Sequence, residues 1–251
     1  MTAKTANEIK SMEKAGRLAA EVLQVTGKAV RAGVTTNELD KIAHDFILSR
    51  NAIPACLGYY GYQKTICTSL NDVICHGVPD DRALREGDIL NIDVTVIVEG
   101  FHGDTSAMFF VGDVSDRAKK ISACAYDAMM KGIEQARAGA RTGDIGFAID
   151  KFVKRQGYKA VREVGGHGIG RVFHEPPFIP SFGKKHHGDL LVKWGTITVE
   201  PMVNETEAPV IEEKIPGSEI LLFRTSDKSL SAQYEHTVLI TDAGSEILTQ
   251  I

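Results

Sequence analysis

Two aspartates on neighbouring strand patterns are the clearest candidates for chemistry in this chain. Asp93 and Asp104 interrupt two runs of strand-forming residues between Ile89 and Val111, and the glycine-bearing segment 99–103 between the runs predicts a hairpin that brings the two carboxylates together. Because the first run is almost entirely apolar, an ionised aspartate within it must be paired or must bind a cation. For one isolated acid, a salt bridge or a capped turn is the simpler interpretation.

A cation becomes the better interpretation because the chain repeats this arrangement. The run ILNIDV, which contains Asp93, is echoed by TITVEP, which contains Glu200. Glu235 opens a further strand pattern, as Asp104 does in the first half. Two half-domains related by a pseudo-twofold axis would gather the four carboxylates. Four acids cannot all stay ionised in one place without cations, and this number of oxygen ligands suits divalent metal ions, as a pair about 3.5 to 4 Å apart.

Histidines near these acids extend the candidate site. His167 lies in GGHGIG, whose spacing matches neither nucleotide-binding loop, GxGxxG or GxxxxGK[ST]. Alone, it is equally typical of a turn, but beside four acids it is the expected nitrogen donor. His76 and His174 lie in loops beside the proposed site, where contact with a substrate or support of the ligands fits better than ligation. His186 and His187 are expected to form an exposed loop pair.

Amphipathic helices are expected to hold these strands in place. The stretches that begin at Ala32 and Ala138 share one spacing of apolar residues, which predicts two equivalent helices. Thr35 with Glu38 predicts a capping box for the first, and Thr142 is the predicted cap of the second. Two further helices are expected over about 7–30 and 116–135, with strands near 65–69 and 160–164.

The composition fits one sizeable globular core. The chain has 251 residues, of which 43% are hydrophobic and 25% charged, and no linker divides it, so we expect a single catalytic domain over 1–251 with halves of about 7–113 and 116–251. A net charge of -4 and a pI near 6.1 give no electrostatic case for nucleic acid or an anionic membrane. No signal-peptide pattern and no long apolar run is present, which predicts a cytoplasmic location.

Several motifs together resemble those of the type I methionine aminopeptidases: NIDVTVIVEGFHGDTS, GHGIG, FHE, TVEPM and SLSAQYEHT. The resemblance runs from about residue 7 to the end. It implies an α+β, pita-bread fold with two pseudo-symmetric αβ halves around a central curved antiparallel sheet. Prolidases, aminopeptidases P and creatinases share the ordered acids and histidine, whereas CLGYYGYQKTICTSLNDVICHGVP is much closer to the methionine aminopeptidases. The short N-terminus also predicts that the extra domain of prolidase-like relatives is absent.

The resemblance implies a site for two divalent metal ions, with cobalt, manganese, iron and zinc as the candidates. Carried over residue by residue, Asp93 binds one ion, His167 and Glu200 bind the other, and Asp104 and Glu235 bridge the two. A metal-activated water would attack the first peptide bond of the substrate, and Glu200 would move the proton as general base and acid.

The resemblance also implies how the substrate is held. His76 and His174 would hydrogen-bond the scissile peptide and its developing charge. The family's methionine pocket, in which a flexible thioether packs on aromatic faces, is matched by Tyr59, Tyr62, Cys67, Phe173 and Leu221. A site for one monovalent cation, sodium or potassium, is matched by Asn71, Val73 and Ser231. Four positions depart from the family's pattern, namely Gln63, Gly165, Trp194 and Leu221, the last of which is usually a tryptophan. These departures leave every predicted ligand in place and bear on pocket affinity and loop geometry.

The residues and the resemblance together predict a metallo-aminopeptidase that removes the N-terminal methionine from nascent proteins and peptides with a small second residue. Its expected partners are nascent polypeptide N-termini, met at the ribosome, with neither nucleic acid nor membrane, and the chain is expected to be a monomer. Two alternatives stay open: an X-Pro peptidase resembling prolidase or aminopeptidase P, and a pita-bread binding module without catalysis.

Overall fold

An antiparallel sheet of nine strands forms the centre of the computed structural model, which describes residues 1–250. Its strands are β1 (Ile53–Pro54), β2 (Cys67–Leu70), β4 (Ile89–Val98), β5 (Phe101–Phe110), β7 (Gly166–Gly168), β8 (Glu175–Ile179), β9 (Thr196–Val199), β14 (Glu235–Ile240) and β15 (Ser245–Ile247). The main path runs β1-β4-β5-β14-β9-β7-β8, with β2 paired to β4 and β15 paired to β14. The direct pairing of β5 with β14 therefore joins the two halves of the sequence.

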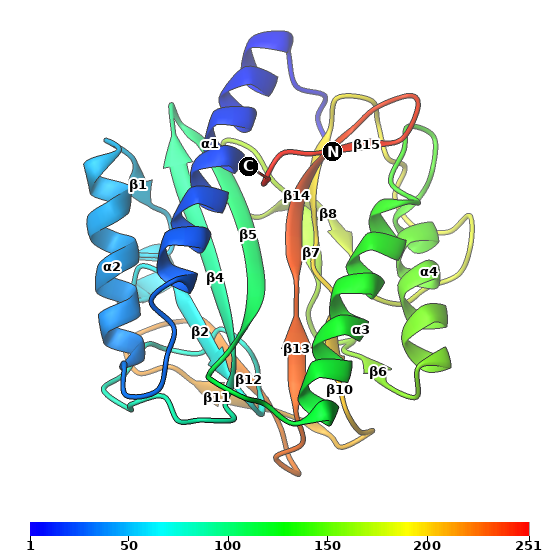
Figure 1. The fold of residues 1–251 in the computed structure, drawn as a ribbon. Coiled ribbons are helices and arrows are strands. Elements are labelled where there is room, and N and C mark those ends of the chain that lie inside the picture. Colours follow the sequence, from blue (N-terminus) through cyan, green and yellow to red (C-terminus); the bar gives the residue numbers. More distant parts are fainter. Residues whose placement is uncertain (251) are drawn as a thin grey trace.

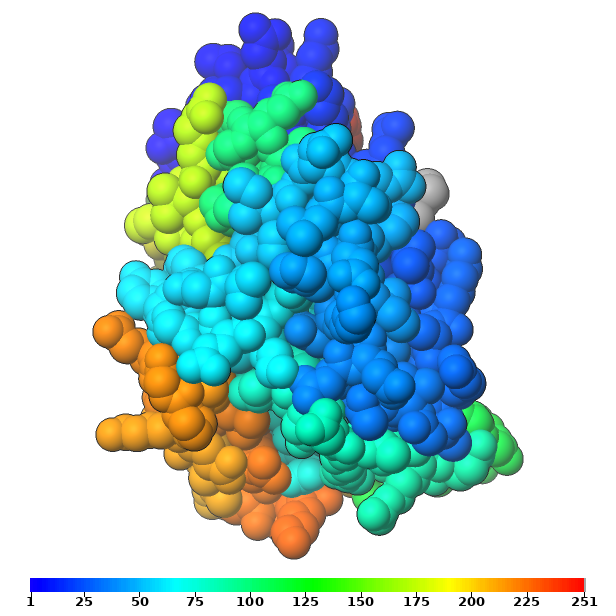
Figure 2. Space-filling view, turned by 90° about the vertical axis from the view of Figure 1, so that its left-hand side faces the viewer, coloured from blue at the N-terminus to red at the C-terminus, as the bar shows by residue number. Residues whose placement is uncertain are grey.

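Two smaller sheets flank the central one. One contains β6 (Lys159–Ala160), β10 (Met202–Asn204) and β13 (Ser231–Gln233), and the other contains β3 (Val73–Cys75), β11 (Val210–Lys214) and β12 (Leu221–Thr225). The loop of the β11–β12 hairpin bonds to the short 3-10 helix η1 (Tyr59–Gly61), because the backbone N–H of Glu219 donates to the Tyr60 carbonyl over 2.9 Å. Figure 2 shows this hairpin, in orange, alongside the cyan segment that contains η1.

Four helices accompany the sheet: α1 (Ala6–Gly27), α2 (Thr36–Ser49), α3 (Asp116–Ile133) and α4 (Thr142–Arg155). Figure 1 shows α1 and α2 beside the β4–β5 half and α3 and α4 beside the other half. The predicted apolar stripes are buried, as at Leu39 and Ile47 of α2 and at Ile145 and Val153 of α4. Within residues 1–250, no helix combines the length and the apolar character that crossing a membrane requires.

The N-cap of α2 agrees with the prediction from the sequence, whereas the N-cap of α4 differs from it. Thr35 and Glu38 form the predicted capping box at the start of α2. The predicted cap at Thr142 is wrong, because the N-cap of α4 is Arg141. The Thr142 hydroxyl instead accepts a hydrogen bond from the backbone N–H of Asp189, which draws it toward the neighbouring loop.

The β4–β5 hairpin is tighter than expected. Only Glu99 and Gly100 form its turn, with φ of 52° and 78°, as a two-residue turn between twisted strands requires. Residues 101–103, expected in the loop, belong to β5. In this register Asp93 pairs with Ser106 while Thr95 pairs with Asp104, so the two aspartates share one face as diagonal neighbours.

Candidate metal centre

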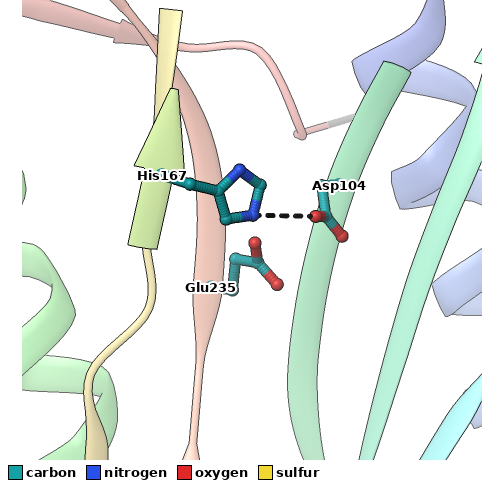
Figure 3. A group of neighbouring side chains, drawn as sticks. All are labelled: Asp104, His167 and Glu235. Carbon is teal, nitrogen blue, oxygen red and sulfur yellow. Dashed lines mark ion pairs between the residues drawn. The ribbon is translucent and has the colours of Figure 1, made fainter. Parts of the chain in front are cut away.

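One cavity of about 280 Å³ is lined by all five predicted metal ligands, which come from five different strand segments. Asp93 lies within β4, Asp104 within β5 and His167 within β7, while Glu200 directly follows β9 and Glu235 begins β14. Figure 3 shows His167 and Asp104 facing each other across the sheet, with Glu235 between them. Strand pairing across the two halves thus brings together side chains that are far apart in the sequence.

The distances within this cluster suit shared ions better than direct hydrogen bonds. Ligand atoms of Asp104, His167 and Glu235 all lie within 4.8 Å of one another. The Nε2 atom of His167 is 3.7 Å from Asp104 Oδ2 and 3.6 Å from Glu200 Oε1. His167 Nδ1 lies 3.0 Å from the Gly168 carbonyl, which can only accept, so Nδ1 carries the proton. The lone pair of Nε2 is therefore free and faces the carboxylates.

Burial makes the cluster unfavourable as a set of bare charges. It raises the pKa of Asp93 to about 7 and that of Glu200 to about 8. For Asp104 and Glu235, burial and then the neighbouring carboxylates raise the pKa well above its ordinary value. Burial lowers the pKa of His167 to about 4, which keeps its imidazole neutral. A buried group of acids that resist ionisation, next to a neutral imidazole, becomes favourable when cations supply the missing charge.

The hydrogen-bond inventory agrees with this interpretation. Glu235 Oε1 is buried and lacks a hydrogen-bond partner among the described residues. Thr95 donates to Asp104 Oδ1 and Thr198 to Glu200 Oε1, both over 2.8 Å, which orients these carboxylates and leaves oxygen lone pairs free. Within residues 1–250, no lysine or arginine forms an ion pair with any of the four acids. Carboxylates and one imidazole with open lone pairs fit divalent metal ions.

Divalent cations should therefore stabilise the fold. We expect Mn²⁺ added to chelator-treated protein to raise the free energy of unfolding by about 2.7 kcal/mol when the ion is at a hundred times its dissociation constant. Scanning calorimetry with and without Mn²⁺ measures this, with NaCl at matched ionic strength as the control. A melting temperature that is equal in the two solutions would contradict a metal site.

Part of the cavity wall is apolar and aromatic. Four of the predicted methionine-pocket residues line it, namely Tyr59, Tyr62, Cys67 and Phe173. The Tyr59 ring packs on that of Phe173 with 4.8 Å between centroids. Tyr62 is almost fully buried, with its hydroxyl 3.1 Å from the Ile66 carbonyl, so it presents its ring and not its polar end. This wall can hold one unbranched apolar side chain against aromatic faces.

The predicted placement of Leu221 in the pocket is wrong. Ile220 lines the cavity in its place, whereas Leu221 is not among the lining residues and packs with the cluster around Ile74 and Phe223. Successive strand residues point to opposite faces, so an error of one position exchanges the pocket residue for its neighbour. Ile220 and Leu222 pack with the cluster that contains Tyr62 and Phe173, whereas Leu221 and Phe223 pack with the cluster that contains Ile74, as strand alternation requires.

Both predicted loop histidines reach the cavity. His76 has a φ of 57°, a strained conformation for a residue other than glycine, and its Nδ1 lies 2.8 Å from the Leu221 carbonyl. His174 stacks on Phe173 with 4.1 Å between ring centroids, and its ring centroid is 4.2 Å from that of His167. Burial and the neighbouring histidines lower the pKa of His174 to about 3. His186 and His187 are exposed, as expected.

The three residues predicted to hold a monovalent cation lie close together outside the cavity wall. Ser231 donates its backbone N–H to the Asn71 carbonyl over 2.9 Å, and Val73 opens the neighbouring strand β3. Asn71 has a φ of 54°, which turns the chain sharply at this point.

Several cavity residues escaped the prediction. Thr95 lies two positions beyond Asp93 on β4, so strand alternation could have identified it. Met202 begins β10, a different strand from the one that Glu200 follows, so alternation gave no signal for it. Val164, Gly165 and Phe178 gave no such signal, because their contact depends on the pairing of β7 with β8. A side chain at Gly165 would come within 2.8 Å of the Ile179 carbonyl oxygen and 3.1 Å of the Phe178 ring, so the glycine lets β8 pack closely here. Two other departures from the family's pattern, at Gln63 and Trp194, lie outside the cavity wall.

Comparisons with known proteins agree with the geometry. The sequence profile of metallopeptidase family M24 matches residues 10–242. The chain is 49% identical over 245 residues to a methionine aminopeptidase of Rickettsia prowazekii, covering 98% of this chain and 93% of that protein. A crystal structure of the Rickettsia prowazekii enzyme superposes with a TM-score of 0.96 at 48% identity, covering all of both chains.

A more distant likeness concerns the fold alone. A prolidase from Pyrococcus horikoshii superposes with a TM-score of 0.75 at 22% identity and covers 99% of this chain and 63% of that one. The similarity to both proteins confirms the expected α+β, pita-bread fold.

Proposed function

Because the chain belongs to metallopeptidase family M24, and within it to the methionine aminopeptidases, we propose that it removes the N-terminal methionine from proteins and peptides whose second residue is small. The observation that carries this proposal is the composition of one cavity. Its polar end holds four carboxylates and an imidazole, and its apolar end is an aromatic slot. We expect one amino-acid residue to occupy this cavity, with its side chain against the aromatic wall and its peptide bond beside the acids.

We assign the metal ligands by position around the cavity. Asp93 would hold one divalent ion, His167 and Glu200 the other, and Asp104 and Glu235 would lie between the two. When bound, such ions lower the pKa of the attacking water and balance the charge that develops on the substrate's carbonyl oxygen. Cobalt, manganese, iron and zinc are the candidate metals, and the unpartnered Glu235 Oε1 supports a site built for them.

The remaining chemistry belongs to the protein's own side chains. Glu200 would take the proton from the attacking water at its carboxylate and return it to the leaving amine, a task suited to a carboxylate that the Thr198 hydroxyl orients. His76 and His174 hydrogen-bond the scissile amide on either side. The aromatic wall, with Tyr59 and Phe173, orients the methionine and excludes water.

The other parts of the proposal concern the setting of the site. Asn71, Val73 and Ser231 would hold one sodium or potassium ion that braces the loops beside the cavity. Residues 1–251 would act as one catalytic domain with halves of about 7–113 and 116–251. The chain would work as a monomer in the cytoplasm on nascent N-termini, at the ribosome.

A peptide panel tests this function. With Mn²⁺, Fe²⁺, Co²⁺ or Zn²⁺ added, we expect release of free methionine from Met-Ala-Ser and no cleavage of Ala-Pro. The apolar slot accepts a thioether, and the amine must lie beside the acids, which fixes the cleavage at the first bond. Faster turnover of X-Pro peptides than of Met-Ala peptides would assign the chain to the prolidase branch.

Substitution at the rim of the slot tests the methionine pocket. Ile220→Ala should raise KM for Met-Ala-Ser roughly fivefold with kcat nearly unchanged, because about 1 kcal/mol of apolar contact is lost equally in ground and transition states. Leu221→Ala is the matched control, since that side chain does not line the cavity. A rise in KM in Leu221→Ala and none in Ile220→Ala would restore the assignment made from the sequence.

A further inference from the structure

The two loop histidines of the cavity, His76 and His174, differ in the group that lies within hydrogen-bond distance of Nδ1. His76 Nδ1 lies 2.8 Å from a backbone carbonyl, that of Leu221. His174 Nδ1 lies 2.8 Å from the Tyr59 hydroxyl. In each case the bonded nitrogen is Nδ1, so Nε2 is the nitrogen left for other contacts. The partners, however, have different hydrogen-bonding capacity: a carbonyl only accepts, whereas a phenol can donate.

The carbonyl fixes the tautomer of His76 without ambiguity. Because the Leu221 carbonyl must accept, His76 Nδ1 carries the proton, and the neutral ring presents a bare Nε2. His76 therefore offers the cavity a hydrogen-bond acceptor.

The phenol favours the opposite tautomer in His174. A phenolic O–H is a stronger donor than a neutral imidazole N–H, and an imidazole nitrogen is a stronger acceptor than a phenolic oxygen, so the Tyr59 proton points at Nδ1. The reverse arrangement would leave the hydroxyl proton to solvent, because no other described residue forms a hydrogen bond with this hydroxyl. The ring is also held in place by stacking on Phe173. Nε2 of His174 then carries the proton.

We propose that Tyr59 is a positioning residue that fixes His174 as the Nε2–H tautomer, so that the cavity presents one acceptor, on His76, and one donor, on His174. This pair complements a peptide amide, which offers one N–H and one C=O. The inference rests on the proposed function for its consequence, since the donor of His174 would stabilise charge that develops on the substrate's carbonyl oxygen. The tautomer itself depends only on the Tyr59–His174 contact.

The variant Tyr59→Phe tests the proposal because it keeps the ring that lines the pocket and removes only the hydroxyl. Protein labelled with ¹⁵N at histidine and loaded with diamagnetic Zn²⁺ reports the tautomer through its imidazole nitrogen shifts, with His174→Ala used to assign the resonances. We expect wild-type His174 to be protonated at Nε2, and Tyr59→Phe to populate the Nδ1–H form. We also expect kcat for Met-Ala-Ser to fall roughly five- to tenfold with KM within twofold, as the loss of one hydrogen bond allows.

Two controls separate positioning from general structural damage. Tyr60→Phe removes the hydroxyl of the neighbouring tyrosine, which is 58% exposed, and should change neither the spectrum nor kcat. In a His174→Ala background, Tyr59→Phe should lower kcat no further, because the hydroxyl acts through that imidazole. Three results would each overturn the proposal. The first is wild-type His174 protonated at Nδ1, and the second is an unchanged spectrum in Tyr59→Phe. The third is a loss of kcat from Tyr59→Phe that is as large in the His174→Ala background as in the wild-type background. The wild-type spectrum needs no substrate, so an Nε2–H His174 in a protein that releases no methionine would refute the proposed function and leave the tautomer assignment standing.

Discussion

Glu235→Ala should lower methionine release by more than about a hundredfold and weaken the binding of both metal ions. Loss of a residue that merely supports a metal ligand commonly costs 10- to 100-fold, and loss of a shared ligand should cost more. Glu235 is 2% exposed, and within residues 1–250 its Oε1 has no hydrogen-bond partner that would keep it in place for another reason. Asp104→Ala should behave in the same way. Asp104 lies on β5, which pairs with β14, and one of its carboxylate oxygens lies within 4.8 Å of ligand atoms of His167 and Glu235.

Binding calorimetry with Mn²⁺ measures this effect independently of turnover. Glu246→Ala is the matched control, since Glu246 is an exposed acid on β15, the strand that pairs with β14. Unchanged binding of two ions in Glu235→Ala would exclude a position between them.

The second large effect is expected at His174. His174→Ala should lower kcat about a hundredfold while metal content stays near normal, because we propose that this imidazole hydrogen-bonds the reacting peptide, and removal of one preorganised donor commonly costs that much. His174 contacts the ring of the proposed ligand His167, so a loss of metal is the specific alternative to examine.

Elemental analysis of the purified variant distinguishes the two roles, and His186→Ala, in an exposed loop, serves as the control. Loss of metal in proportion to the loss of activity would make His174 a ligand.

Sequence patterns predicted the structure correctly where interactions between residues a few positions apart determine it. The apolar stripe through Leu39 and Ile47 predicted α2, and Thr35 with Glu38 predicted its first turn, because helix periodicity and capping depend on residues within a few positions. The equivalence of Asp93 and Glu200 in the two halves of the sequence predicted that acids from both halves meet. A pseudo-twofold axis brings equivalent positions together, so this prediction does not depend on individual contacts.

The errors lie where pairing between distant segments decides the outcome. Counting back along the chain placed Leu221 in the pocket, but Ile220, one position earlier, lines it. Thr142 was expected to cap α4, but its hydroxyl bonds to Asp189 across a loop. Phe178 reaches the cavity over Gly165 only because β8 folds back on β7. None of these contacts leaves a periodic signal in one sequence.

Anomalous scattering from crystals of the wild-type protein soaked in MnCl₂ tests the central claim most directly, because it locates the ions without reference to activity. We expect two manganese peaks in the cavity, both flanked by the carboxylates of Asp104 and Glu235, with one beside Asp93 and the other beside His167 Nε2 and Glu200. A cavity without manganese, or manganese bound there without contact to Asp104 and Glu235, would contradict a site in which four buried acids exist to hold two ions.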